Sequence, residues 1–491
     1  MAPLNPQETF DALMKQQRHV AAGDLAHEMT KKHPGLGRWW FAAGRAALAR
    51  GRLQEAADKL DRAEKLLTND ADVQLQRAIV DHRLARSALA IQRLRALIAS
   101  HPSNEVDATI VLAEVLHRAN EKSQLDQLFS ASGDDAPWKA DPRAQLFVAR
   151  IRAREDPAGA IFILDGIARS NAATPTRRIA GFEAIRLLDS SARYREAFDL
   201  AVFMHASTGT RHDTGGIEAE ITAQARILAR GGSIAIARAR APQVESTAII
   251  VALPRSGTTL LEQMLDRHPS VTGIGEYEGI HSMSESAISK GLQSSEWGSV
   301  DLHDAQVWQQ EYLLGAACLR RPTARWTLDK TLHAWRLLPL IAAVLPGAVM
   351  IAVDRDPRDT AISTFLGNFH PTAFGWSGSI ESIQRVITAH RTLLPGALER
   401  LGFAHELVVY ENLVADPSGH AQRCLARMGL AMDATTLAPE HNPRTVLTLS
   451  HDQVRRPINR SSIGRWRNYA WAFDGAWDCL AESHAARVLH E

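Results

Sequence analysis

Arginine, hydroxyl residues and glycine are concentrated in the stretch PRSGTT, residues 254–259. An arginine can form charge-assisted hydrogen bonds to an anion, and a glycine lets the backbone come close to a ligand. The stretch follows an apolar β-branched run and opens an amphipathic helix, whose first N–H groups also favour negative charge. The candidate phosphate-binding residues are Arg255, Ser256, Gly257, Thr258 and Thr259. The alternative is a plain strand-to-helix turn with hydroxyl caps.

This loop lacks the lysine and the glycine spacing of a nucleoside triphosphatase. The Walker pattern GxxxxGK[ST] is not met, and no nearby residue is evident as a magnesium ligand. We therefore predict a phosphate group other than the β and γ phosphates of ATP, and no metal.

A second anion site is predicted in AVDRDPRDTAISTF, where Arg355 ends an apolar run and Ser363 follows eight residues later. Two anion sites at neighbouring strand ends suit a ligand with separated phosphates, such as an adenosine bisphosphate. The alternative for Arg355 is a surface ion pair with Asp356 or Asp359.

The elements that position these residues alternate between strands and helices from residue 247 onward. TAIIVAL, GAVMIAVD and HELVVYENL are short buried-strand candidates separated by helical patterns. Such alternation predicts a P-loop-like α/β domain with a parallel sheet, and ligands at the carboxyl ends of its strands.

The first 210 residues are rich in Ala, Leu and Arg and predict successive short helices. The spacing around Trp40, Gly44 and Ala47 resembles the tetratricopeptide repeat, and three turn positions follow its 34-residue period: Pro34, Thr68 and Pro102. Ala22 and Ala158 lie on the phase of Ala56. An irregular helical bundle is the alternative. We expect tetratricopeptide-like helical repeats at 1–210, a helical linker at 211–246 and the α/β domain at 247–491.

Composition narrows the class of protein further. The formal net charge is +1, which gives no reason to expect nucleic-acid binding, and the three cysteines lie far apart. The longest uncharged run, residues 337–353, is too short to span a bilayer and contains prolines. With no secretory leader recognised, we expect a cytoplasmic protein without a membrane span. The oligomeric state is left open.

Three motifs together resemble the sulfotransferases that use 3′-phosphoadenosine-5′-phosphosulfate: PRSGTTLLEQMLDRHPSV, RDPRDTAIS and SHDQVRRPINRSSIGRWRNY. The most similar branch is that of the protein-tyrosine sulfotransferases and their bacterial relatives with tetratricopeptide repeats. The resemblance covers roughly residues 247–469. It implies that residues 255–259 bind the 5′-phosphosulfate, and that Arg355 and Ser363 bind the 3′-phosphate. It further implies that a segment at 450–459 folds over the donor, and it adds three donor-site residues: Tyr410, Asn459 and Arg465.

The resemblance also implies three catalytic residues. Glu276 falls where the family has its base, and Lys330 and Ser450 fall where it stabilises the sulfuryl group. A phenol has a pKa of about 10, so attack at neutral pH benefits from a positioned base. Each assignment has an alternative. Glu278 could be the base in place of Glu276, Lys330 could form a surface ion pair with Asp329, and Ser450 could cap a loop.

The leading hypothesis is an enzyme that transfers a sulfuryl group to a hydroxyl, with a tyrosine of a protein or peptide as the expected acceptor. A sugar, lipid or small-molecule hydroxyl is the second choice. Other readings are a non-catalytic helical-repeat adaptor with a nucleotide-binding domain, and a metal-dependent kinase or nucleotidase. The repeats are expected to bind the acceptor polypeptide or a partner, since stacked helix pairs offer concave surfaces; structural support is the alternative.

Overall fold

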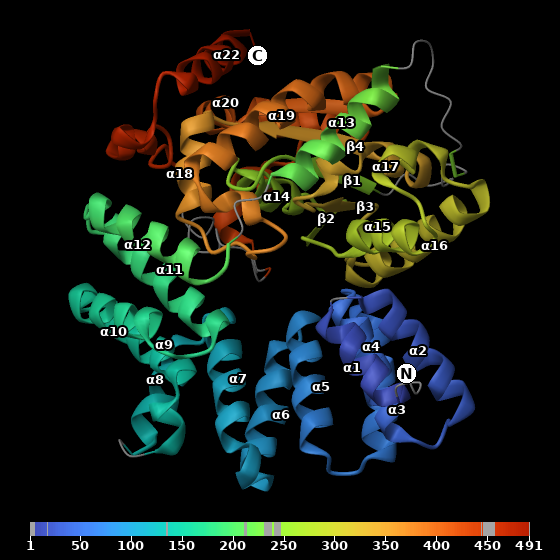
Figure 1. Ribbon diagram of the computed structural model, residues 1–491, viewed down its shortest axis with the longest axis vertical. Helices are drawn as coiled ribbons and strands as arrows, with labels where there is room; N and C mark the ends of the chain where they lie inside the picture. The colour runs from blue at the N-terminus through green and yellow to red at the C-terminus, as the bar shows by residue number, and fades with distance from the viewer. Residues whose placement is uncertain are drawn as a thin grey trace. The chain divides into compact units, whose positions relative to one another are not determined.

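The computed structural model describes residues 5–16, 18–133, 136–210, 214–229, 238–239, 247–442, 444 and 457–490. Packing divides the chain into two compact units (Figure 1). One comprises Met1–Glu155 with His281–Ser286, and the other Asp156–Ile280 with Ala287–Glu491.

The N-terminal part of the first unit is helical throughout its described residues, as predicted. Its α-helices are α1 (Pro6–Lys15), α2 (His19–Lys32), α3 (Gly37–Ala49), α4 (Leu53–Leu66), α5 (Ala71–Arg83), α6 (Ser87–Ser100), α7 (Glu105–Arg118), α8 (Lys122–Ala131) and α9 (Pro142–Arg152). Helices α3, α5 and α7 begin 34 residues apart (71 − 37 and 105 − 71), as do α2, α4 and α6 (53 − 19 and 87 − 53). The 34-residue period predicted from the turn positions is therefore confirmed for α2–α7.

Small residues allow the paired helices to pack closely. Ala22 and Ala56 are fully buried, and a Cβ on Gly44 would lie 2.7 Å from Leu60 Cγ. The prediction that Ala158 continues this phase is wrong, because Ala158 is exposed. The fully buried residue is Ala160, the fourth of α10 (Pro157–Arg169), just as Ala56 is the fourth of α4. Helix α10 begins two residues later than three 34-residue periods after the start of α4 would place it.

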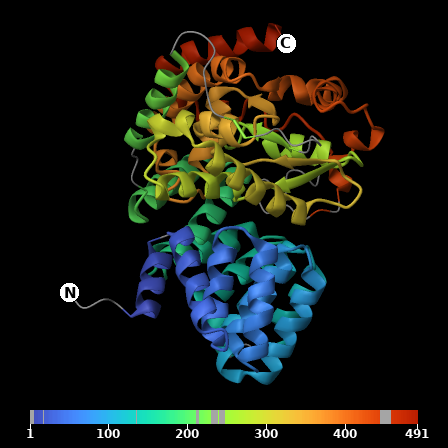
Figure 2. The ribbon, with the colours of Figure 1, turned by 90° about the vertical axis from the view of Figure 1, so that its right-hand side faces the viewer.

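The second unit contains one five-stranded parallel sheet, which confirms the predicted α/β architecture (Figure 2). Its strands are β1 (Thr247–Val251), β2 (Val271–Gly275), β3 (Trp326–Asp329), β4 (Val349–Asp354) and β5 (Ala404–Val409). Their order is β2-β3-β1-β4-β5, and all four pairings are parallel. Because the strands are parallel, the residues that follow β1 and β4 emerge side by side at the carboxyl edge, as do those that follow β2 and β3.

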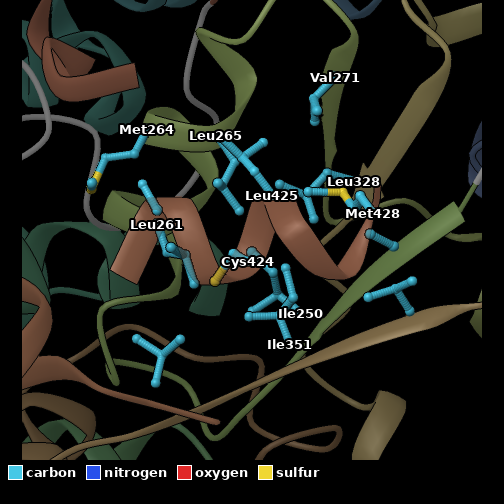
Figure 3. Packing of buried hydrophobic residues seen from close by; sticks show 14 of the residues in the cluster. Ile250, Leu261, Met264, Leu265, Val271, Leu328, Ile351, Cys424, Leu425 and Met428 are labelled. Atoms are coloured by element: carbon cyan, nitrogen blue, oxygen red, sulfur yellow. The ribbon is translucent and has the colours of Figure 1, made fainter. Parts of the chain in front are cut away.

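Helices surround this sheet. They are α13 (Gly215–Ala229), α14 (Thr258–Asp266), α15 (Gly279–Ser289), α16 (Leu302–Leu319), α17 (Leu338–Val344), α18 (Pro357–Phe365), α19 (Ile380–Arg400), α20 (Tyr410–Ala415), α21 (Pro417–Arg427) and α22 (Ala476–His490). Figure 3 shows the core between α14, α21 and the sheet, where Leu261, Leu265, Cys424 and Leu425 lie near Ile250. This core fixes the start of α14, and with it the predicted phosphate loop.

The second unit also includes α10, α11 (Thr174–Ser190) and α12 (Tyr194–Ser207). The first strand, β1, begins at Thr247, after these helices and α13. Packing, in contrast, joins these helices to the sheet. None of the helices in the described part of the chain has the length and apolar character needed to cross a membrane.

Candidate active site

The predicted phosphate loop connects β1 to α14 in an unusual backbone conformation. Gly257 caps α14 with a φ of 92°, and Arg255 has a φ of 67°, so both lie in the left-handed region. A Cβ on Gly257 would lie 2.2 Å from Cδ2 of Tyr410. Glycine is therefore required twice, by its φ and by the tyrosine ring. The three hydroxyl residues of the loop, Ser256, Thr258 and Thr259, are buried beside it.

The structure brings the two predicted anion sites together. Arg255 Nε donates to Ser363 Oγ at 2.8 Å, and Arg355 Nη1 donates to the carbonyl oxygen of Arg255 at 2.7 Å. Arg355 follows β4 and Arg255 follows its neighbour β1, so sheet topology alone accounts for their approach. These two arginines, together with Arg465, are called the arginine cluster below.

Arg355 is buried rather than a surface residue. Its side chain is 7% exposed, and its guanidinium lies 4.8 Å from the centre of the Tyr410 ring. Asp359 Oδ2 is 3.7 Å from it, so part of the alternative ion-pair interpretation is correct. The same carboxylate accepts the backbone N–H groups of Gly464 at 2.6 Å and Trp466 at 2.8 Å. Asp359 therefore also ties the segment after residue 457 to α18.

Positive charge predominates in the arginine cluster. Burial, and then the charges of Arg355 and Arg465, lower the pKa of Arg255 to about 10. Burial removes the water that would stabilise the charged guanidinium, and the neighbouring positive charges oppose its charged form further. An anion with more than one negative charge would compensate this site.

The chain between residues 450 and 472 holds three of the predicted site residues: Ser450, Asn459 and Arg465. Arg465 begins the 3₁₀ helix η8 (Arg465–Ala472) and donates to Asp189 of α11. Asn459 is exposed. Its side-chain amide forms hydrogen bonds within its own turn: Nδ2 donates to the carbonyl oxygen of Pro457, and Oδ1 accepts the N–H of Ser461. Ser450, and the predicted covering segment as far as residue 456, lie outside the described residues.

Glu276 and Lys330 form an ion pair at the other side of the carboxyl edge. Glu276 follows β2, Lys330 follows β3, and Lys330 Nζ donates to Glu276 Oε1 at 2.8 Å. The lysine side chain is 1% exposed and the glutamate side chain 44%. The alternative pairing of Lys330 with Asp329 is wrong. The contact favours Glu276 over Glu278 as the carboxylate beside the lysine. Glu276 and Lys330 are called the lysine–glutamate pair below.

Asp329 is instead held on the opposite side of its strand. Its carboxylate accepts hydrogen bonds from Tyr312 at 2.8 Å and Thr331 at 2.7 Å, and Thr331 Oγ1 also lies 2.8 Å from the carbonyl oxygen of Tyr277. Burial raises the pKa of Asp329 to about 7, although the two hydroxyl contacts oppose this rise. These contacts join the residues that flank Lys330 to the residue that follows Glu276.

Sequence reasoning missed two carboxylates on α14 that hold the end of β2. Glu262 accepts the N–H of Gly275 at 2.8 Å, and Asp266 accepts the N–H of Gly273 at 2.7 Å. Arg444 pairs with Glu262 at 2.5 Å. The available signal was a pair of acids four residues apart on an otherwise apolar helix, TTLLEQMLD. Through them α14 contacts both the phosphate loop and the strand that carries Glu276.

The fold and this site define a parallel α/β domain whose loop after β1 has no Walker lysine. Residues 248–434 match the model of the Sulfotransferase family. Among the described residues, no group of three or more His, Cys, Asp or Glu is placed to hold a metal ion.

Curated proteins are similar to parts of this chain. An uncharacterized protein of Aquifex aeolicus is 28% identical over 60% of this chain and 40% of that protein. Protein-tyrosine sulfotransferase 2 of Gallus gallus is 26% identical over 44% of this chain and 61% of that protein. The chain thus spans 40–61% of the length of these two relatives. Among solved structures, the sulfotransferase domain of a Synechococcus olefin synthase is 20% identical, with a TM-score of 0.34, and covers 50% of this chain and 98% of that domain.

Proposed function

We propose that this chain transfers a sulfuryl group from 3′-phosphoadenosine-5′-phosphosulfate to a hydroxyl acceptor. The observation that carries the proposal is the arginine cluster, in which Arg255 contacts both Ser363 and Arg355. Such a cluster at adjacent strand ends suits a nucleotide with phosphates on two positions of its ribose. The helix start at Thr258 adds backbone N–H groups to the same site.

The lysine–glutamate pair supports the transfer step. Glu276, more exposed than Lys330, would take the proton from the acceptor hydroxyl as its oxygen attacks sulfur. The bond between sulfur and the 5′-phosphate oxygen breaks, and adenosine 3′,5′-bisphosphate leaves. Lys330 is buried and fixed, so its charge is placed in advance to stabilise the equatorial oxygens of the sulfuryl group.

A tyrosine of a protein or peptide is the acceptor that we propose. Its support is the similarity to protein-tyrosine sulfotransferases of Gallus gallus, at 26% identity, and Danio rerio, at 25% identity. The 34-residue helical hairpins add a second argument, because stacked helix pairs present extended surfaces that bind polypeptides. Binding energy from such remote contacts would supplement the few contacts that a single ring offers.

Radiolabelled phosphosulfate and a panel of acceptors test the proposal. The purified chain should transfer label to tyrosine-containing proteins or peptides with a lower KM than to simple phenols. Label that appears only on sugars, lipids or small phenols would overturn the proposed tyrosine acceptor but would still support sulfuryl transfer. A chain that binds adenosine 3′,5′-bisphosphate but labels no acceptor would favour the non-catalytic alternative.

A further inference from the structure

We propose that Asp189, near the end of helix α11, is a positioning residue of the donor site. It orients Arg465 toward Arg255 and Arg355, and it does so from a helical hairpin, α11–α12, that precedes the residues matching the sulfotransferase family. This inference rests on the proposed function, since it assigns a role in binding the same donor.

Both carboxylate oxygens of Asp189 are used by η8. Oδ2 accepts a hydrogen bond from Arg465 Nη2, and Oδ1 accepts one from the Tyr469 hydroxyl at 2.7 Å. Asp189 is the penultimate residue of α11. A negative charge in the last turn of a helix is unfavourable, because the free carbonyl groups there are also negative. The arginine offsets that repulsion, so the position of Asp189 is explained by its partner rather than by the helix.

Aromatic packing fixes η8 against the same hairpin. The Tyr469 ring is fully buried and lies 5.4 Å from Tyr194 and 6.4 Å from Phe198, both on α12. Arg195 stacks over Trp471 at 4.2 Å. The backbone of η8 is therefore held by α12, and Asp189 then selects the direction of the Arg465 side chain.

Arg465 remains able to reach an anion while it is held. Its side chain is 30% exposed, compared with 15% for Asp189. Three residues before it, the carbonyl oxygen of Ser462 accepts a hydrogen bond from Arg355 Nη2, which brings the start of η8 beside Arg355. A guanidinium has five N–H donors, so a bond to Asp189 leaves others for a phosphate oxygen.

The test is the affinity of the full-length chain for adenosine 3′,5′-bisphosphate, measured by calorimetry well below the melting temperature. We expect Asp189→Asn to raise Kd about tenfold, because the neutral amide keeps the shape but no longer holds the arginine by charge. Asp189→Glu should recover part of this loss, and also serves if Asp189→Asn does not fold. The exposed Asp199 of α12 provides the matched control: Asp199→Asn should leave Kd unchanged.

A double-mutant cycle separates positioning from general support of the fold. If Asp189 acts through Arg465, adding Asp189→Asn to Arg465→Gln should change Kd less than twofold further, and the acceptor KM should stay constant throughout. Additive losses, or equal losses for donor and acceptor, would make Asp189 merely structural and overturn the inference. Unchanged or tighter binding by Asp189→Asn alone would also overturn it while leaving the proposed function intact. No binding by the unmodified chain would overturn both.

Discussion

The arginine cluster and the lysine–glutamate pair occupy two sides of the same sheet edge, and they are built on opposite principles. The arginines lie at the ends of β1 and β4 and in η8, where burial, and then the charges of the other two arginines, depress the pKa of Arg255. Lys330 and Glu276, at the ends of β3 and β2, already neutralise each other at 2.8 Å. The cluster has three guanidinium groups and two paired carboxylates, Asp359 and Asp189, so it keeps an excess of positive charge that favours an anion. When Glu276 takes a proton from the acceptor, the positive charge of Lys330 is left to interact with the sulfuryl oxygens. Under the proposed function, the arginine cluster binds the donor and the lysine–glutamate pair carries out the transfer.

The sharpest test of that division is Glu276→Gln. We expect turnover to fall by about 10²–10⁴, the usual contribution of a general base, while the Kd for adenosine 3′,5′-bisphosphate stays the same. Glu278→Gln is the matched control and should remain active. The assignment of the base would be wrong if the two variants exchanged these behaviours in a steady-state assay.

The arginine side should respond in the opposite manner. Arg255→Ala and Arg355→Ala each remove a charge-assisted phosphate contact worth about 1.5–3 kcal/mol, so Kd for the bisphosphate should rise roughly 10- to 100-fold. Calorimetry on folded variants measures this directly. An unchanged Kd for the bisphosphate in both variants would show that the arginine cluster does not bind the donor.

The contacts that hold Arg355 in place should make the free energy of unfolding depend on pH. Arg391 donates to the carbonyl oxygen of Arg355 at 2.9 Å and pairs with Asp354, which also contacts His484 of α22. Burial lowers the pKa of His484, but hydrogen bonds to Asp354 and Glu411 outweigh it and raise the value to about 9.

Because this pKa is raised on folding, the stabilisation is fully present below pH 6.5, the ordinary value, and is lost as pH rises through about 9. Between those limits the unmodified chain should lose about 3 kcal/mol of unfolding free energy relative to His484→Gln. Urea titrations at both pH values give the comparison. Parallel curves for the two proteins would show that His484 stabilises nothing by its charge.

The smallest expected effect is that of a chelator. The proposed reaction uses the charges of Lys330 and the arginines, so turnover in excess chelator should equal turnover without it. A complete loss that magnesium restores would contradict sulfuryl transfer as we propose it and favour phosphoryl transfer.

Local patterns were sufficient to predict much of this molecule. The strand, loop and helix around Gly257 could be inferred because turn geometry and apolar periodicity act over a few residues. Arg355 and Ser363 could be placed beside Arg255 because parallel strands bring their carboxyl ends together. The period of the early helices was also visible in turn residues such as Pro34 and Pro102, since each hairpin repeats the same short connection.

Contacts between distant segments could not be inferred in this way. Asp189 and Arg465 are 276 residues apart, and nothing in the local sequence of either indicates the other. The buried carboxylate of Glu262 also depends on Arg444, which is 182 residues away. A two-residue shift moved the buried alanine from Ala158 to Ala160, because residues added between helices α6, α8 and α10 are invisible to a fixed period.

The left-handed backbone of Arg255 has a consequence for the thermodynamics of donor binding. For a residue with a Cβ atom, the left-handed conformation costs roughly 1–2 kcal/mol of conformational free energy. The contacts that hold it here come from the chain itself, through Arg355 and Ser363. That cost is therefore incurred once, during folding, rather than at each encounter with a ligand. A preorganised loop keeps more of its contact energy as affinity, so the donor should bind with a small entropic penalty from the protein.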